Sequence, residues 1–163
     1  FRYGKARIED KLMDEHIYLT EGTTANMAYP FYNASLMTLT EWTAKHNWYA
    51  TREAIELLTI ECQKHSPQQI LNIGTHSAGV RAKKLKYARL PLFWRAFALF
   101  VYRYFFRLGF LDGKEGFLWH FLQGWWYRTL ADAKVYEVKK RCGNDPKAIE
   151  EEIKRISISK LKV

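Results

Sequence analysis

Four carboxylates and a histidine lie close together near the start of the sequence. Glu9 and Asp10 form one acidic pair, and Asp14 and Glu15 form a second pair, which His16 follows. Residues four positions apart share a helix face, so one short helical turn would hold the two pairs near each other. Adjacent carboxylates with a histidine can take a proton from a hydroxyl or help to bind a divalent metal ion. The alternative is a charged helix start exposed to solvent, because runs of charge usually form such faces.

The residues after the acidic segment alternate in the manner of strands. Residues 16–20 predict one strand, Glu21 and Gly22 a turn, and residues 26–31 a second strand. Functional residues are often carried by loops at the edge of a rigid scaffold. We therefore expect a strand hairpin to position the acidic segment.

Three longer strings carry a resemblance to a known family. They are RYGKARIEDKLMDEHIYLTEG, WTAKHNWYATREAIELL and LGFLDGKEGFLWHFLQGWWYRTLADAK, and the resemblance that they carry covers most of residues 1–140. These strings resemble the carboxy-terminal half of bacterial family 2 glycosyltransferases, enzymes of the GT-A type that build lipopolysaccharide and exopolysaccharide. The resemblance implies an inverting enzyme, which transfers a sugar from a nucleotide-sugar donor to a lipid-linked or polysaccharide acceptor.

The resemblance also implies roles for individual residues. In the family's related motif the general base is the second acid of a pair, which points first to Glu15 and then to Asp14. A divalent metal ion, Mg²⁺ or Mn²⁺, neutralises the leaving diphosphate, and His16 is a candidate ligand for it. The family holds this metal mostly with an Asp-x-Asp motif, which the sequence lacks. We therefore expect the chain to be a fragment of a longer enzyme and to be inactive alone.

An aromatic and basic cluster lies within the first long helix that the sequence predicts. Apolar residues recur at three- and four-residue steps from residue 35 to residue 64, and Ser35 can cap this helix. Trp42, Lys45 and His46 fall within two turns of it. One interpretation is a stripe that faces the core, with a hydrogen-bonded histidine. The other is a substrate site in which Lys45 or His46, beside Trp42, contacts a phosphate of the donor or the acceptor.

The excess of positive charge is confined to one block of the sequence. The chain has 26 Lys and Arg residues against 17 Asp and Glu residues, a net charge of +9. Residues 62–111 contain nine of the basic residues and no acidic residue. Such a block indicates an anionic partner. Nucleic acid is the least favoured partner, because the basic residues alternate with Phe, Trp and Leu and no nucleic-acid motif is present.

Residues 92–110 predict an aromatic helix with three arginines. The longest uninterrupted apolar run within it is seven residues, whereas a bilayer span needs about 20. On a regular helix Arg95, Arg103 and Arg107 lie within roughly 120° of one another. With Trp94 beside them, they predict a helix that lies in the interface of an anionic membrane. The alternative is an ordinary buried helix.

A short turn at residues 111–114 predicts that this helix pairs with a second helix at 116–138. A last helix begins at Asp145 and Pro146, which suit its cap and first position. Cys62 and Cys142 lack the spacing of a metal or redox motif, and we expect both to be reduced thiols.

Together these elements predict a mainly α-helical chain with a small β element near its N-terminus. Residues 1–34 would form the end of the GT-A catalytic domain, and residues 35–163 a helical region with a membrane-interface hairpin at about 92–138. The expected location is the cytoplasmic face of the bacterial inner membrane, as a peripheral enzyme. The alternative from another class is a non-catalytic helical module that binds a membrane surface or scaffolds an assembly.

Overall fold

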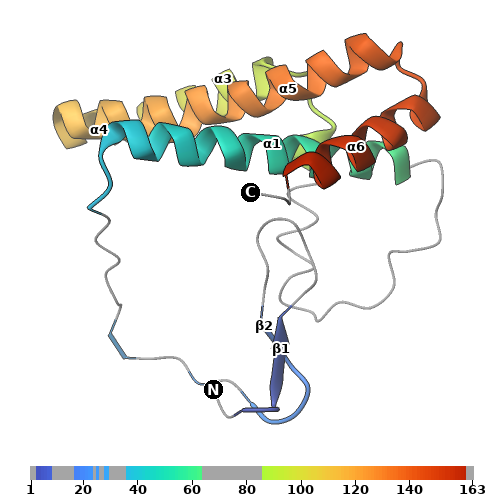
Figure 1. Ribbon diagram of the computed structural model, residues 1–163. Helices are drawn as coiled ribbons and strands as arrows, with labels where there is room; N and C mark the ends of the chain where they lie inside the picture. Colours follow the sequence, from blue (N-terminus) through green and yellow to red (C-terminus); the bar gives the residue numbers. More distant parts are fainter. Residues whose placement is uncertain are drawn as a thin grey trace.

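The computed structural model describes residues 3–8, 17–23, 25, 28–29, 36–63 and 86–160, without the side chains of 158–160. These residues form a layer of helices and a separate two-stranded sheet (Figure 1). The prediction of a mainly helical chain with a small β element near the N-terminus is confirmed.

The sheet consists of two short antiparallel strands. Strand β1 (Ala6–Ile8) pairs with β2 (Ile17–Leu19), and Ile8 is the partner of Ile17. The predicted strand at 16–20 is therefore present. The predicted second strand at 26–31 is wrong for its described residues, 28 and 29, which form a bend. Alternation along a sequence does not identify the pairing partner, and here β2 pairs with the segment that precedes it.

Helix α1 (Leu39–Gln63) begins with a reciprocal pair of hydrogen bonds. The backbone N–H of Thr38 donates to Glu41 Oε2 at 2.8 Å, and the backbone N–H of Glu41 donates to Thr38 Oγ1 at 3.3 Å. This capping box supplies partners for backbone donors that a helix start leaves unpaired. The predicted cap, Ser35, lies outside the described residues, and Thr38 takes that role.

The predicted helix pair at 92–138 is present, but its arms are not uniform α-helices. The first arm is α3 (Trp94–Val101) followed by the π-helix η2 (Tyr102–Phe106), and Leu108, with φ 59°, ends it. The returning arm contains the 3₁₀ turn η3 (Gly109–Asp112), α4 (Gly113–Trp119), the π-helix η4 (His120–Trp126) and α5 (Tyr127–Cys142). The predicted turn at 111–114 thus lies wholly within this second arm, across the junction of η3 and α4.

Two glycines allow the helical segments to pack closely where the chain reverses. A Cβ added to Gly116 would lie 2.4 Å from Asp112 Cβ and 2.8 Å from the Gly109 carbonyl oxygen. A Cβ added to Gly109 would lie 2.3 Å from His120 Nε2. Larger residues at these positions would force the turn apart, so the turn is tightly closed.

Helices α1 and α5 lie side by side and run in the same direction, and α6 (Pro146–Lys160) folds back onto them (Figure 1). The parallel direction also follows from the core contacts, because later residues of α1 meet later residues of α5. Near the start Ala50 packs with Tyr127 and Ala131, and further along Leu58 packs with Val135, Val138 and Ile149 of α6.

Helix α6 begins as predicted. The side chain of Asp145 accepts hydrogen bonds from the backbone N–H groups of Lys147 and Ala148, both at 3.3 Å. Both cysteines are free, as predicted. Burial raises the pKa of the Cys62 thiol, which keeps it in its unreactive protonated form.

We predict that Thr38→Ala lowers the free energy of unfolding by about 1 kcal/mol, because it removes the N-cap of α1. The hydrogen bonds from the Thr38 backbone and side chain lower the pKa of Glu41. Their contribution is therefore present above the pKa of an unfolded glutamate and is lost as the pH falls through the lower folded pKa. Urea unfolding at several pH values measures both effects.

Thr40→Ala is the matched control, since Thr40 is equally exposed at the start of α1. Alanine is the better helix former, so this variant should be as stable as the parent chain or slightly more stable. Equal losses in the two variants would contradict the capping role of Thr38.

Candidate functional site

The acidic segment lies outside the described residues, and with it Glu9, Asp10, Asp14, Glu15 and His16. The structure describes the residues that flank it. Ile8 at the end of β1 is paired with Ile17 at the start of β2. The two flanks of the acidic segment are therefore held next to each other by the sheet.

The substrate residues predicted on α1 are brought together with residues of the second arm. The rings of Trp42 and His46 stack with centroids 3.5 Å apart and an interplanar angle of 19°. Tyr127 meets the His46 ring edge-on at 5.5 Å, and Trp126 lies 6.1 Å from Trp42. Trp42 and His46 are both half-buried. The cluster thus joins the first turns of α1 to the end of η4 and the start of α5.

The hydrogen bond of His46 determines which ring nitrogen carries its proton. Nδ1 lies 2.8 Å from the carbonyl oxygen of Trp42. A carbonyl oxygen only accepts, so Nδ1 is the donor, and in the neutral ring Nε2 retains its lone pair. Lys45 is exposed one residue earlier, with its Nζ 5.5 Å from the ring centre of Tyr49.

This arrangement has features of both interpretations of the α1 cluster, a stripe that faces the core and a substrate site. The histidine is hydrogen-bonded and packed, as expected for a structural residue, yet the cluster reaches the surface beside the exposed Lys45 cation. An aromatic face suits the C–H face of a sugar ring, and an ammonium group suits a phosphate. These side-chain types would suit a phosphorylated sugar, and binding through Trp42, Lys45 and His46 stays a prediction.

Arg95 occupies a different place from the one the sequence predicted. Its side chain is 1% exposed and forms an ion pair with Asp132 of α5, which is equally buried. Arg95 Nε donates to Asp132 Oδ1 at 2.9 Å, and Nη1 donates to the carbonyl oxygen of Ala88 at 3.2 Å. The prediction that Arg95 faces a membrane is therefore wrong. The reason is that a partner 37 residues away draws its charge into the interior.

Asp132 also fixes the start of α3. The backbone N–H of Phe93 donates to Asp132 Oδ2 at 2.8 Å. Phe93 has φ 68°, a conformation that residues other than glycine rarely adopt. The hydrogen bond to a buried carboxylate stabilises this strained residue.

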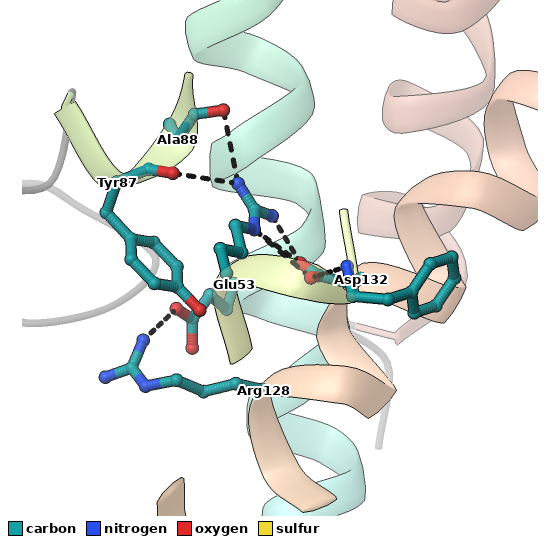
Figure 2. Close-up of polar contacts among 7 residues, drawn as sticks. Glu53, Tyr87, Ala88, Arg128 and Asp132 are labelled. Carbon is teal, nitrogen blue, oxygen red and sulfur yellow. Dashed lines mark hydrogen bonds and ion pairs between the residues drawn. The ribbon is translucent and has the colours of Figure 1, made fainter. Parts of the chain in front are cut away.

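A second ion pair lies beside the first (Figure 2). Arg128 Nη1 lies 3.4 Å from Glu53 Oε1 of α1. The ring of Tyr87 lies 4.9 Å from the Arg95 guanidinium carbon and 5.2 Å from that of Arg128. Burial raises the pKa of the Tyr87 hydroxyl, and the neighbouring Arg128 opposes part of this rise. These groups tie α1, α3 and α5 together through charges rather than through apolar contact alone.

Asp132, Glu53 and Arg128 were not singled out from the sequence, although one signal was present. Asp132 is the one acidic residue between positions 116 and 136. A lone acid within an aromatic helix, opposite a helix with a lone arginine in its first turn, favours an ion pair across the hairpin.

The remaining membrane residues are accessible. Trp94 is 72% exposed, Arg107 is exposed and Arg103 is half-buried. Among the described residues, no helix combines the length and apolar character needed to cross a membrane. Their role at a membrane stays a prediction.

The described part of the chain contains no group of three His, Cys, Asp or Glu side chains that would hold a metal ion. Comparisons with protein-family models, curated proteins and solved structures gave no match. A function is therefore inferred from the residues themselves and from their arrangement.

We predict that Asp132→Asn lowers the free energy of unfolding by about 3–5 kcal/mol, because it leaves the buried charge of Arg95 without its counter-charge. Asp112→Asn is the matched control. It makes the same chemical change at an exposed position of the same hairpin, and should cost less than about 0.5 kcal/mol. Urea unfolding measures the free energy of unfolding of both variants. A loss in Asp132→Asn as small as that in Asp112→Asn would show that the ion pair is dispensable.

Proposed function

We propose that this chain is the carboxy-terminal part of an inverting, GT-A type family 2 glycosyltransferase that acts in cell-envelope glycan synthesis. The observation that carries the proposal is the acidic segment, because it lies within the first of three strings that resemble this family. The register of β1 and β2 supports a site there, since the sheet pairs the residues on both sides of the segment.

In the proposed reaction, an acceptor hydroxyl attacks the anomeric carbon of a nucleotide-sugar. Glu15, or else Asp14, takes the hydroxyl proton while the new carbon–oxygen bond forms. The bond between the anomeric carbon and the donor phosphate breaks, and the nucleoside diphosphate leaves with that electron pair. Because the attack comes from the face opposite the leaving group, the anomeric configuration inverts.

The charge of the leaving diphosphate needs a counter-charge. In this family a divalent metal ion, Mg²⁺ or Mn²⁺, supplies it. The described residues offer no ligand cluster for such an ion, and His16 is the candidate ligand of this chain. Lys45 and His46 would contact a phosphate of the donor or acceptor, and Trp42 would stack on the sugar.

The acceptor is proposed to be lipid-linked or part of a polysaccharide, and the enzyme is proposed to act at the cytoplasmic face of the bacterial inner membrane. Arg103, Arg107 and Trp94 support contact with an anionic lipid surface, now without Arg95. The same exposed residues support the second candidate function, a non-catalytic helical module that binds a membrane surface or scaffolds an assembly.

We predict that Glu15→Gln, made in the complete enzyme, lowers kcat by about 10²-fold or more and leaves donor binding nearly unchanged, as expected for the loss of a general base. Asp14→Asn is the companion variant. Steady-state kinetics and donor binding by calorimetry separate the two effects. Normal turnover of the Glu15→Gln variant, together with an inactive Asp14→Asn variant, would move the base to Asp14. Full activity in both variants would exclude this site.

We also predict that Lys45→Ala raises the KM for the phosphorylated substrate by about tenfold, because a charge-assisted contact is lost. Arg52→Ala is the control, since it removes a cation from the same helix that instead covers the Trp48 ring at 3.5 Å. Equal changes of KM in the two variants would show a general effect of surface charge rather than a contact of Lys45.

A further inference from the structure

The reversal of the helix hairpin exposes an unusual amount of apolar surface. Residues 105–119, hereafter the hairpin tip, carry eight exposed large apolar side chains. Phe106 is 74% and Leu111 is 69% exposed. The others are Phe105, Leu108, Phe110, Phe117, Leu118 and Trp119. Exposed apolar patches of this kind mark surfaces that contact a protein or a membrane.

The tip is exposed on more than one side. Phe117, Leu118 and Trp119 are consecutive residues of α4, and all three are exposed. Successive helix residues are about 100° apart, so these side chains cover roughly 200° of the circumference. A protein partner or a second copy would cover one face of the helix. Apolar side chains directed to several sides fit an apolar medium that surrounds the tip.

The tip also projects from the helical layer. In Figure 1 the turn of the hairpin, in yellow to pale orange, extends past the start of α1. Its elements, η3 and α4, make their main contacts with each other and with the π-helices η2 and η4. Gly109 and Gly116 are closely packed within this turn.

The charges around the tip favour an anionic surface. Residues 86–111 contain no acidic residue, and the one buried cation among them, Arg95, is already neutralised by Asp132. Arg103 precedes the tip and Arg107 lies within it, and neither has an acidic partner within the described part of the chain. Tyr102 and Trp119 add the amphipathic rings that favour the interface between lipid headgroups and acyl chains.

We propose that the hairpin tip inserts into the headgroup–acyl boundary of an anionic lipid bilayer. The depth is interfacial, because Asp112, Lys114 and Glu115 are exposed at the reversal and need headgroup water. This inference deepens the membrane contact of the proposed function and assigns the main contact to the apolar tip rather than to the arginines of the first arm. It does not depend on sugar transfer.

The test is sedimentation of residues 1–163 with phosphatidylcholine vesicles that contain phosphatidylglycerol. The double variant Phe106→Ser/Leu111→Ser should bind about 10²-fold more weakly, since each side chain removed from the acyl boundary costs about tenfold. The control is Leu90→Ser/Tyr136→Ser, which alters two exposed apolar residues outside the tip. It should bind within about twofold of the parent chain, as expected for exposed residues that lie outside the surface in contact with lipid.

Charge reversal separates the contribution of the apolar tip residues from that of Arg103 and Arg107. Arg103→Glu/Arg107→Glu should weaken binding at low salt, and the part of the binding that remains at high salt should depend on Phe106 and Leu111. If the arginine variant loses binding and the tip variant does not, membrane contact stands and tip insertion is overturned. If the unaltered chain does not bind vesicles, tip insertion and the membrane part of the proposed function both fail, while sugar transfer is judged separately.

Tip insertion can also be tested on the unaltered chain. Hydrogen exchange with and without vesicles should show slower exchange in residues 105–119 and no change in α1. Uniform protection, or none, would overturn the proposal. Light scattering tests the alternative that the tip contacts a second copy of this chain. If the parent chain is a dimer and the tip variant is a monomer, the tip is a dimer contact and the proposal is overturned.

Discussion

The buried ion pair between Arg95 and Asp132 is the interaction on which the helical part depends. Asp132 accepts hydrogen bonds from the Arg95 guanidinium and from the backbone of Phe93, while Arg95 donates to the carbonyl oxygens of Tyr87 and Ala88. A buried charge costs several kcal/mol unless it is paired and fully hydrogen-bonded. Arg95 and Asp132 are both paired and hydrogen-bonded only when the first arm, the segment before it and α5 pack together as they do here. The pair therefore specifies how the hairpin closes.

The other features follow from this closure. With α3 and α5 in register, Arg128 is placed beside Glu53 and the aromatic rings of Trp126 and Tyr127 meet Trp42 and His46. The candidate substrate residues are thus positioned by contacts of α1 with α5. At the opposite end of α5, apolar contacts with Leu58 and Ile149 complete the core. The hairpin tip receives none of these contacts, which leaves its apolar side chains exposed.

Local signals in the sequence predicted the helices well, but they missed strand β1 and did not show which side of each helix faces the core. Periodicity predicted the helix at 35–64, which is present as α1 at 39–63, and capping predicted the start of α6 at Asp145; both signals involve near neighbours. The position of Arg95 could not be obtained in this way, because aromatic residues surround the first arm and periodicity alone does not show which side is inside. Its partner is distant in sequence, and the π-helices shift the angle at which Arg103 and Arg107 project. For the site, the sequence identified the α1 cluster, but its neighbours Trp126 and Tyr127 depend on the docking of α5. The acidic segment lies outside the described residues, so its role remains as the sequence predicts it.

The parallel course of α1 and α5 has a kinetic consequence. Their polar contacts join residues 75 and 78 positions apart, whereas Arg95 and Asp132 are 37 positions apart. Contacts between distant residues require closure of a longer loop, which slows their formation. We therefore expect the hairpin to fold first and α1 to dock in a later step. Substitutions at Leu58 should then speed unfolding and leave the folding rate almost unchanged, and the opposite pattern in a chevron analysis would place α1 in the folding nucleus.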